Sequence, residues 1–298
     1  MPDESKERLD HYLVRTGFAP SRRVAQELVE RGLVRINGRR SKKSEVVGAE
    51  DRVEVAATNR RAVIEPNADL ALEVIHEDAS VIVVNKPGGM PCHPLNADER
   101  DTVMNAVVAR FPDVATVGEK PLEGGLLHRL DNGTSGALLI ARNRGTFEKL
   151  RDAIRAGRIA RRYEALVAGF VERKTEIDTP IAHHAKNARK MIVGDPSSTN
   201  PKRAGRAAIT VVEPIRRVVE FTLLSIAPKT GSRHQIRVHL ASLGHPIVGD
   251  TLYGGPASES LPHGRFWLHL CDVAFDSPAV GHVKVTAPIP TDLQTMID

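Results

Sequence analysis

Between two apolar runs the chain carries the sequence His128-Arg129-Leu130-Asp131-Asn132-Gly133-Thr134-Ser135-Gly136. Residues 126–127 precede it and residues 137–141 follow it, so the sequence predicts a strand, a polar loop and a second strand. The loop places a carboxylate, a guanidinium and an imidazole within four residues, beside small residues that let a ligand approach the backbone. A simple turn, in which Asp131 caps the backbone and pairs with Arg129, is the alternative that composition leaves open.

Strands outnumber helices in the chain around this loop. Apolar runs predict further strands at residues 71–76, 81–85, 162–168, 207–212, 220–226 and 282–286. Helical spacing of apolar residues predicts helices at 102–110, 145–156 and 234–243. Because helices and strands do not alternate regularly, we expect an α+β domain over residues 71–298, with a mixed, largely antiparallel sheet rather than a doubly wound one.

The first 57 residues show a different pattern, with two short helices followed by strands. Residues 8–13 and 24–29 have helical spacing, and Ser21 is placed to cap the second helix. Residues 33–36 and 52–55 read as strands, and Asn37-Gly38 is a strong signal for a hairpin turn. We therefore expect a small α/β unit over 1–57, followed by a polar linker over 58–70.

Length and composition limit the class of protein. A chain of 298 residues has room for one large domain and one small domain. No stretch approaches the roughly 20 apolar residues of a membrane span, and the N-terminus has no apolar signal segment. Two cysteines cannot build a disulfide framework. We expect a cytoplasmic protein without a membrane partner, and nothing in the sequence requires more than a monomer.

Basic residues are concentrated in two places although the net charge is only +5. Residues 20–43 contain eight basic and two acidic side chains, and residues 142–162 have the same balance. Such stretches indicate either contact with a polyanion at two places or solvated helix faces. Aromatic residues make up 4% of the chain, which argues against a surface that stacks many bases.

Several common catalytic motifs are missing from the sequence. It has no phosphate-binding loop, no dinucleotide-binding glycine motif and no pair of cysteines two residues apart. Ala137 stands where a serine-hydrolase motif needs its last glycine. His234 and His239 are five residues apart and fall off one helix face, while His183 and His184 are adjacent, so neither pair suits a metal. We expect no metal site.

A second polar cluster lies at residues 230–239, Thr-Gly-Ser-Arg-His-Gln-Ile-Arg-Val-His. If this segment is helical, Arg233 and Arg237 are four residues apart and share a face. Two guanidinium groups on one face can bind a carboxylate and phosphates.

The residues of the loop match the His-Arg-Leu-Asp-x-x-Thr-Ser-Gly motif of the RluA-type RNA pseudouridine synthases, which this chain resembles. Further matching motifs follow the family order: Asn85-Lys86-Pro87-x-Gly89 with His93-Pro94, Tyr163 in Arg-Tyr-Glu-Ala-Leu-Val, His234 to His239, and Gly244 to Gly254. Residues 8–55 separately resemble the S-four RNA-binding domain, with Arg8-Leu9-Asp10, Ser21-Arg22-Arg23 and Val34-x-Ile36-Asn37-Gly38. Together the two resemblances cover almost the whole chain.

The resemblance implies a pseudouridine synthase fold that converts uridine to pseudouridine in structured RNA. The glycosidic bond breaks, the uracil turns, and C5 instead of N1 is joined to the ribose. Asp131 matches the catalytic aspartate, and Arg237 matches the arginine that keeps this carboxylate ionised among phosphates. The sequence leaves open whether Asp131 attacks the ribose, attacks the base or abstracts a proton. Isomerisation exchanges no electrons and no external group, so no cofactor is expected.

The remaining site residues are also implied by the resemblance. Arg129 matches the arginine that fills the gap left by the flipped base, and Tyr163 matches the tyrosine that packs on the target base. The cations of residues 142–162, with Lys186, Arg189 and Lys190, are expected to line the cleft. Ser232 stands where the family commonly has arginine, which leaves the role of Arg233 open. The S-four domain is expected to bind the RNA backbone through Arg22, Arg23, Arg39, Arg40, Lys42 and Lys43.

The partner implied is RNA. An attached S-four domain favours ribosomal RNA of the large subunit by analogy, and transfer RNA stays open. The alternative function is a catalytically silent RNA-binding or ribosome-assembly module, which predicts loss of Asp131, Tyr163 or Arg237. All three are present, and a nuclease would need clustered acids that the surroundings of Asp131 lack. The sequence therefore favours an active isomerase.

Overall fold

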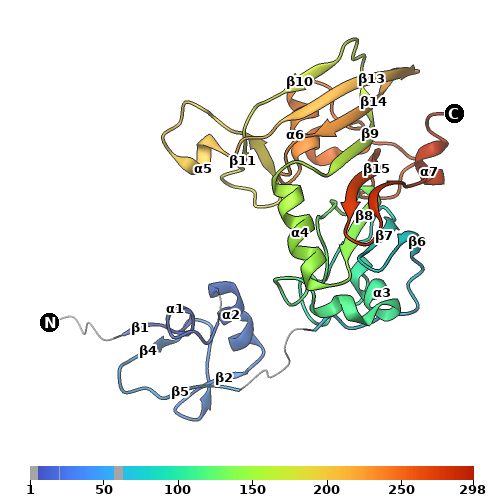
Figure 1. Cartoon of the computed structure of the whole chain (residues 1–298). Helices are drawn as coiled ribbons and strands as arrows, with labels where there is room; N and C mark the ends of the chain where they lie inside the picture. Colours follow the sequence, from blue (N-terminus) through green and yellow to red (C-terminus); the bar gives the residue numbers. More distant parts are fainter. Residues whose placement is uncertain (1–5, 20, 57–62) are drawn as a thin grey trace. The chain divides into compact units, whose positions relative to one another are not determined.

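The computed structural model describes residues 6–19, 21–56 and 63–298. The chain divides into two compact units, Met1–Arg61 and Ala62–Asp298 (Figure 1). Of the expected linker at 58–70, residues 58–62 lie outside the described residues. Ile64 is buried in the core of the larger unit, and Asn67 donates its backbone N–H to the Asn105 carbonyl at 3.0 Å. The packing of the larger unit thus begins before residue 71.

The smaller unit consists of two helices and short strands. In chain order its elements are β1 (Glu7–Arg8), α1 (Leu9–Arg15), α2 (Arg22–Glu30), β2 (Val34–Ile36), β3 (Arg39–Arg40), β4 (Val46–Val47) and β5 (Val53–Val55). Both predicted helices are confirmed, and the Ser21 hydroxyl accepts the Val24 N–H at 3.4 Å as the cap of α2. Apolar side chains of both helices and of β2 and β4 share one core, which includes Leu9, Leu13, Leu28, Val34, Ile36 and Val47.

The turn at Asn37-Gly38 sets the sheet of this unit. Both residues have positive φ, 52° and 78°, which is the conformation that a tight hairpin turn requires. The turn joins β2 to β3, and β5 pairs antiparallel with the other edge of β2. The predicted turn and the predicted strand at 52–55 are both confirmed, and the turn leaves the basic Arg39–Arg40 pair exposed at the sheet edge.

The larger unit is built on one sheet. Its strands are β6 (Glu73–Glu77), β7 (Val81–Lys86), β8 (Ser135–Ala141), β9 (Ala160–Ala168), β10 (Thr175–Ile177), β11 (Ile181–His183), β12 (Met191–Val193), β13 (Thr210–Val218), β14 (Phe221–Pro228), β15 (Leu268–Ser277) and β16 (Gly281–Thr286). Nine described strands form the order β10-β13-β14-β9-β15-β8-β7-β6, with β16 also paired to β15. Only the pairing of β8 with β15 is parallel among these strands. The predicted α+β class with a mixed, largely antiparallel sheet is confirmed.

Helices of the larger unit are few and short. They are α3 (Val103–Arg110), η1 (Pro112–Thr116), α4 (Arg144–Arg155), α5 (Pro201–Ala204), α6 (Gln235–Ser242), η2 (Thr251–Tyr253) and α7 (Thr291–Gln294). The predictions at 102–110, 145–156 and 234–243 correspond to α3, α4 and α6. In Figure 1, α6 lies with β13, β14 and β9, whereas α3 lies near β6 and β7. No helix in the described part of the chain is long and apolar enough to cross a membrane.

One predicted strand is not formed, and the sequence missed several strands, the longest among them. The strand expected at 126–127 is wrong: Leu126 forms only an isolated bridge with Ile140, because the chain turns into the polar loop at once. The longest strand, β15, was not predicted. Its run Leu-His-Leu-Cys-Asp-Val-Ala-Phe-Asp-Ser includes two polar side chains, His269 and Asp272, that the fold buries, so the apolar pattern is broken.

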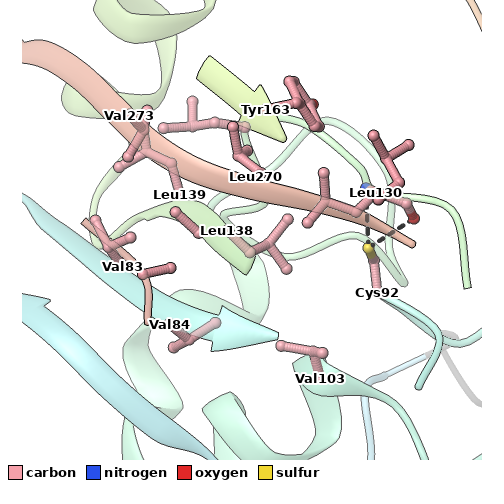
Figure 2. Packing of buried hydrophobic residues seen from close by; sticks show 14 of the residues in the cluster. Val83, Val84, Cys92, Val103, Leu130, Leu138, Leu139, Tyr163, Leu270 and Val273 are labelled. Atoms are coloured by element: carbon pink, nitrogen blue, oxygen red, sulfur yellow. Dashed lines mark hydrogen bonds between the residues drawn. The ribbon is translucent and has the colours of Figure 1, made fainter. Parts of the chain in front are cut away.

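The centre of the sheet is the core. All seven residues of β8 are buried, and β7 and β15 flank it with buried valines and leucines (Figure 2). Burying one such side chain contributes about 1.5–3 kcal/mol. The polar loop therefore leads directly into a fully buried central strand, and its last two residues, Ser135 and Gly136, already belong to β8.

Candidate active site

Two buried cations hold the loop that precedes β8. The Lys86 side chain is fully buried, and its Nζ donates to the Asn132 carbonyl at 3.1 Å and to the Pro87 carbonyl at 2.8 Å. Burial lowers the pKa of Lys86 to about 8, with the nearby Arg265 charge acting in the same direction. Arg265 donates to the Gly133 carbonyl and, at 2.9 Å, to the Ser135 hydroxyl. The carbonyls of Asn132 and Gly133 are thus both held by charged donors.

The glycines of the loop are required by space. A Cβ on Gly133 would lie 2.5 Å from the Gly264 carbonyl oxygen. Gly136 has φ of 120°, and a Cβ there would lie 2.2 Å from the Leu270 carbonyl oxygen on β15. Both residues let the loop pack against neighbouring backbone, which a larger residue would push away.

Cys92 fixes the residue directly before Asp131. The Leu130 N–H donates to Cys92 Sγ, and the Cys92 thiol donates to the Leu130 carbonyl, both at 3.2 Å (Figure 2). Burial raises the pKa of this thiol, so it keeps the proton that it donates. The N–H and the carbonyl of Leu130 are therefore both bonded to one side chain. This fixes the backbone directly before Asp131.

Asp131 meets Arg237 at the edge of a small cavity. Arg237 Nη1 donates to Asp131 Oδ2 at 2.8 Å. On its other edge the same guanidinium makes two bonds to Asp250, Nε to Oδ2 at 2.7 Å and Nη2 to Oδ1 at 2.8 Å. The three side chains are unequally exposed: Asp131 is 27% exposed, Arg237 8% and Asp250 2%. The accessible member of this buried network is the carboxylate that the sequence identified.

Aromatic rings enclose the Arg237 guanidinium. Its carbon lies 4.4 Å from the centre of the Phe266 ring and 5.0 Å from the centre of the Tyr253 ring. Burial opposes its charge, but hydrogen bonds to Asp250 and the charges of both aspartates outweigh that effect and raise the pKa of Arg237. The guanidinium is held charged and nearly immobile, so it offers Asp131 a constant positive partner.

The cavity beside Asp131 brings the predicted substrate residues together. It has a volume of about 70 Å³ and is lined by Arg129, Leu130, Asp131, Thr134, Tyr163, Ser232, His234, Ile236, Arg237 and Leu268. Tyr163 is 7% exposed, and its hydroxyl has no hydrogen-bond partner within the described residues. Arg129 is exposed, and its Nη1 lies 3.4 Å from His93 Nε2. Asp131, Arg237, Tyr163 and Arg129 thus share one site.

His128, the imidazole of the loop, faces away from this chemistry. It does not line the cavity, and its Nε2 accepts the Leu139 N–H at 3.1 Å. Burial lowers its pKa to about 3, so the ring is neutral. The expectation that the loop brings a carboxylate, a guanidinium and an imidazole into one site is therefore corrected. Arg129 and Asp131 line the site, whereas His128 bonds the backbone of β8.

The small unit presents the six predicted RNA-binding cations on its surface, where most of them already have partners. Arg22 pairs with the buried Asp10 at 2.9 Å, and Arg23 pairs with Glu27 at 3.0 Å. Arg39 pairs with Glu45 and Lys43 with Glu30, while Arg40 donates to the Glu30 carbonyl at 3.1 Å. The Lys42 ammonium forms no ion pair with a described acid. All six are exposed.

Two basic stretches of the larger unit differ in how far their charge is neutralised. Within residues 142–162, ion pairs engage Arg142, Arg144, Arg151, Arg155 and Arg162, and no cation of this stretch lines the cavity. Residues 181–206 contain six basic residues and one acid, Asp195. None of these six forms an ion pair with an acid that the structure describes: Lys186, Arg189, Lys190, Lys202, Arg203 and Arg206.

Arg233 links this free basic segment to the site. Its guanidinium donates to the Ala188 carbonyl at 3.1 Å and to the Arg189 carbonyl at 3.3 Å. Lys190 Nζ lies 5.5 Å from the centre of the Tyr253 ring, whose hydroxyl accepts the Met191 N–H at 2.9 Å. The segment that carries the unpaired cations is therefore fastened to the residues around Arg237.

Sequence reasoning named no role for several residues of the site. Asp250 and Tyr253 lie in the Gly244 to Gly254 motif and Lys86 in the Asn85 to Gly89 motif, so the resemblance gave their positions without their contacts. Phe266 had no signal in the sequence.

No group of three or more His, Cys, Asp or Glu side chains among residues 6–19, 21–56 and 63–298 is arranged to hold a metal ion.

Comparison with known proteins gives a consistent result. The family model for RNA pseudouridylate synthase matches residues 80–242, and the model for the S4 domain, the S-four domain of the sequence prediction, matches residues 7–53. An RNA pseudouridine synthase of Bacillus subtilis is 31% identical over 99% of this chain and 95% of its own. The ribosomal large subunit pseudouridine synthase D of Haemophilus ducreyi is 31% identical over 98% of this chain and 90% of its own.

A solved structure has the same fold in the larger part of the chain. Human RNA pseudouridylate synthase domain containing 1 superposes with a TM-score of 0.59 at 26% identity. The match covers 76% of this chain and 86% of the human one. The superposition covers far more of the chain than any single motif. The two proteins therefore share the fold that positions the site.

Proposed function

This chain belongs to the RNA pseudouridylate synthase family and is an isomerase, and we propose that it acts through Asp131 on a uridine flipped out of ribosomal RNA. The observation that carries the proposal is the Asp131 carboxylate, accessible at the edge of the cavity and bonded to the buried Arg237 at 2.8 Å. A carboxylate that works among phosphates needs a cation to keep it ionised. Arg237 supplies that cation without leaving its own buried network.

Flipping the uridine requires groups that offset the loss of stacking, which costs a few kcal/mol. Arg129 is exposed beside Asp131, so its planar guanidinium can occupy the space that the base leaves. Tyr163, on β9, lines the same cavity, where its ring can pack on the extruded base. The cavity itself holds about 70 Å³, and the loop 128–136 closes one side of it. The groups present suit a single planar ring.

The RNA backbone has two proposed binding surfaces. One is the exposed set of cations on the S4 domain, which gives affinity without sequence information. The other is residues 181–206, whose six cations lack ion-pair partners among the described acids. A phosphate can pair with these side chains without breaking an existing ion pair, whereas at most of the S4 cations and at five arginines of 142–162 it must replace an acid.

Large-subunit ribosomal RNA is the proposed substrate, because the Haemophilus ducreyi relative that spans both domains is named for it. The test is release of tritium from uridine C5 by the wild-type protein, using ribosomal and transfer RNA transcripts. Joining C5 to the ribose expels its hydrogen, so release reports the isomerisation. Release from ribosomal RNA supports the proposal, and release from transfer RNA alone contradicts the substrate class.

A further inference from the structure

His234 has a backbone conformation that demands an explanation. Its φ and ψ are 54° and 20°, in the left-handed region, directly before α6. A non-glycine residue held there costs on the order of 1–3 kcal/mol, and such strain persists where the surroundings enforce it. The start of a helix does not require this strain, because many residues begin a helix in relaxed extended backbone. The result of the conformation is that the imidazole lines the cavity beside Asp131.

The hydrogen bonds around the ring fix its tautomer. Arg233 Nε–H donates to His234 Nε2 at 3.4 Å, so Nε2 carries a lone pair and the proton resides on Nδ1. Nδ1–H then donates to the Tyr253 hydroxyl oxygen at 2.8 Å. That oxygen also accepts the Met191 N–H at 2.9 Å, which uses its second lone pair. The tautomer with the proton on Nδ1 satisfies all three hydrogen bonds. In this tautomer the basic nitrogen is Nε2, on the side of the ring away from Tyr253.

The basic nitrogen lies beside the reacting carboxylate. Nε2 is 3.9 Å from Asp131 Oδ2, and the His234 side chain is 10% exposed. Burial lowers the pKa of His234 to about 4, and the charges of Arg237 and Arg233 act in the same direction against those of Asp131 and Asp250. The ring is therefore neutral at pH 7, and Nε2 carries its basic lone pair.

The reaction needs such an acceptor. Once C5 has been joined to the ribose, it carries both the new bond and its original hydrogen, and that hydrogen must leave. We propose that His234 is a catalytic residue, the base that takes the C5 proton; the assignment rests on the proposed function. The C1′–C5 bond has formed, the C5–H bond breaks onto Nε2, and its electron pair restores the C5–C6 double bond. N1, which left the ribose with its electron pair, takes a proton from water.

The imidazolium that this step produces has a partner in place. Asp131 Oδ2 at 3.9 Å provides the opposite charge, so the step does not leave an isolated cation in a buried site. Release of the proton to water then returns the neutral ring. The same proton leaves as tritium when C5 is labelled.

Other groups near the cavity fit this role less well. Tyr163 is buried, which raises the pKa of its phenol, so at pH 7 it keeps its proton and offers only a weakly basic oxygen. His93 does not line the cavity, and its Nδ1 is engaged with the Pro94 carbonyl at 2.9 Å. His128 does not line the cavity. His234 combines a neutral Nε2, held only by a long 3.4 Å bond from the exposed Arg233, with a place in the cavity beside Asp131.

The test compares wild type with His234→Asn, because asparagine tolerates the left-handed conformation and keeps the backbone in place. We expect kcat to fall about 10²-fold, as for loss of a general base, with RNA affinity within a few-fold of wild type. RNA that carries deuterium at uridine C5 gives the decisive reading. Proton removal becomes rate-limiting in the variant, so a kinetic isotope effect on kcat rises clearly above that of wild type. The exposed His282→Gln is the matched control.

Several results would overturn the assignment. One is a kcat for His234→Asn within about 3-fold of wild type, since general bases contribute far more. Another is a fall in kcat without a rise in the isotope effect, which assigns His234 a structural role. An isotope effect that rises in Tyr163→Phe and not in His234→Asn moves the base to Tyr163. If wild type itself releases no label, the proposed function fails, which is a separate outcome.

A second variant covers the case in which His234→Asn does not fold. Tyr253→Phe removes the hydroxyl oxygen that accepts the His234 Nδ1–H. The imidazole then lacks the hydrogen bond that fixes its orientation. A smaller fall in kcat, again with a raised isotope effect, is expected. An isotope effect equal to that of wild type in Tyr253→Phe contradicts the proposal.

Discussion

Arg237 and Asp250 form a two-point ion pair, at 2.7 and 2.8 Å, that is almost completely buried. The pair fixes the plane of the guanidinium, so that its remaining edge meets Asp131 at one position. Asp250 also balances the charge of Arg237, which keeps the buried cation from being alone before substrate binds. Asp250 thus acts on the chemistry through Arg237, as a positioning residue.

Asp250→Asn is predicted to lower both stability and turnover. Removing one member of a buried ion pair costs about 3–5 kcal/mol of unfolding free energy, because the other charge stays buried. Urea unfolding measures this loss, and tritium release gives kcat. The matched control is Asp276→Asn, whose partner His282 is on the surface and which should change stability by less than about 0.5 kcal/mol. Equal stability of the two variants contradicts the account.

Cys92→Ala is predicted to impair the position of Asp131. The change leaves the N–H and carbonyl of Leu130 without their shared partner, and each unsatisfied buried group costs about 1–3 kcal/mol. We expect kcat to fall while RNA affinity is retained. Cys271→Ala is the control, because Cys271 is also buried and its thiol bonds the His269 carbonyl, at 3.7 Å, instead of the loop that carries Asp131. If both variants keep wild-type kcat, Cys92 has no positioning role.

His269 is predicted to contribute to acid unfolding. Its Nδ1 lies 2.8 Å from the Ser135 hydroxyl and its Nε2 lies 3.2 Å from the Ala287 carbonyl. Burial lowers its pKa from 6.5 to about 4 in the folded chain. Between these pH values the unfolded chain binds a proton that the folded chain does not, so stability falls as pH falls.

The slope of this effect is about 1.4 kcal/mol per pH unit for one histidine. Urea unfolding of His269→Gln between pH 6.5 and 4 should therefore depend less on pH than unfolding of wild type. His282→Gln, at an exposed position, should keep the wild-type slope. A His269→Gln slope equal to that of wild type shows that the ring is protonated in the folded state.

Removal of residues 1–61 is predicted to weaken RNA binding and to flatten its dependence on salt. For every phosphate that the shortened chain no longer neutralises, the slope of log K against log salt becomes shallower by roughly 0.7–0.9. The larger unit has its own core, which includes Ile64, so the cut should leave that core intact. Filter binding across a range of salt concentrations measures the slope. An unchanged slope removes the proposed role of the S4 domain.

Much of the fold could be predicted because its signals are local. Asn37-Gly38 specifies a turn, Ser21 specifies a helix start, and the apolar run before Arg142 specifies a buried strand. β15 could not be found in this way, since its polar residues His269 and Asp272 are satisfied by Ser135 and Arg162 from distant parts of the chain. A pattern read along the sequence carries no information about such partners.

The site shows the same division. Asp131, Arg129, Tyr163 and Arg237 were named from motifs, and the structure places them around one cavity. The cations of residues 142–162 were expected to line the cleft, but none lines the cavity, and five of the arginines pair with acids. Local charge counts cannot see such pairing. The roles of Asp250 and Arg233 depend on contacts across 13 and 44–45 residues of sequence, which only the fold reveals.

The most direct test of the central claim is tritium release from C5-labelled ribosomal RNA by wild type and by Asp131→Asn. Asparagine keeps the shape of the side chain and removes the charge, so the account predicts release by wild type and none by the variant. RNA binding by the variant should stay within a few-fold of wild type. Release by Asp131→Asn at a rate comparable to wild type contradicts the assignment of Asp131 as the catalytic carboxylate.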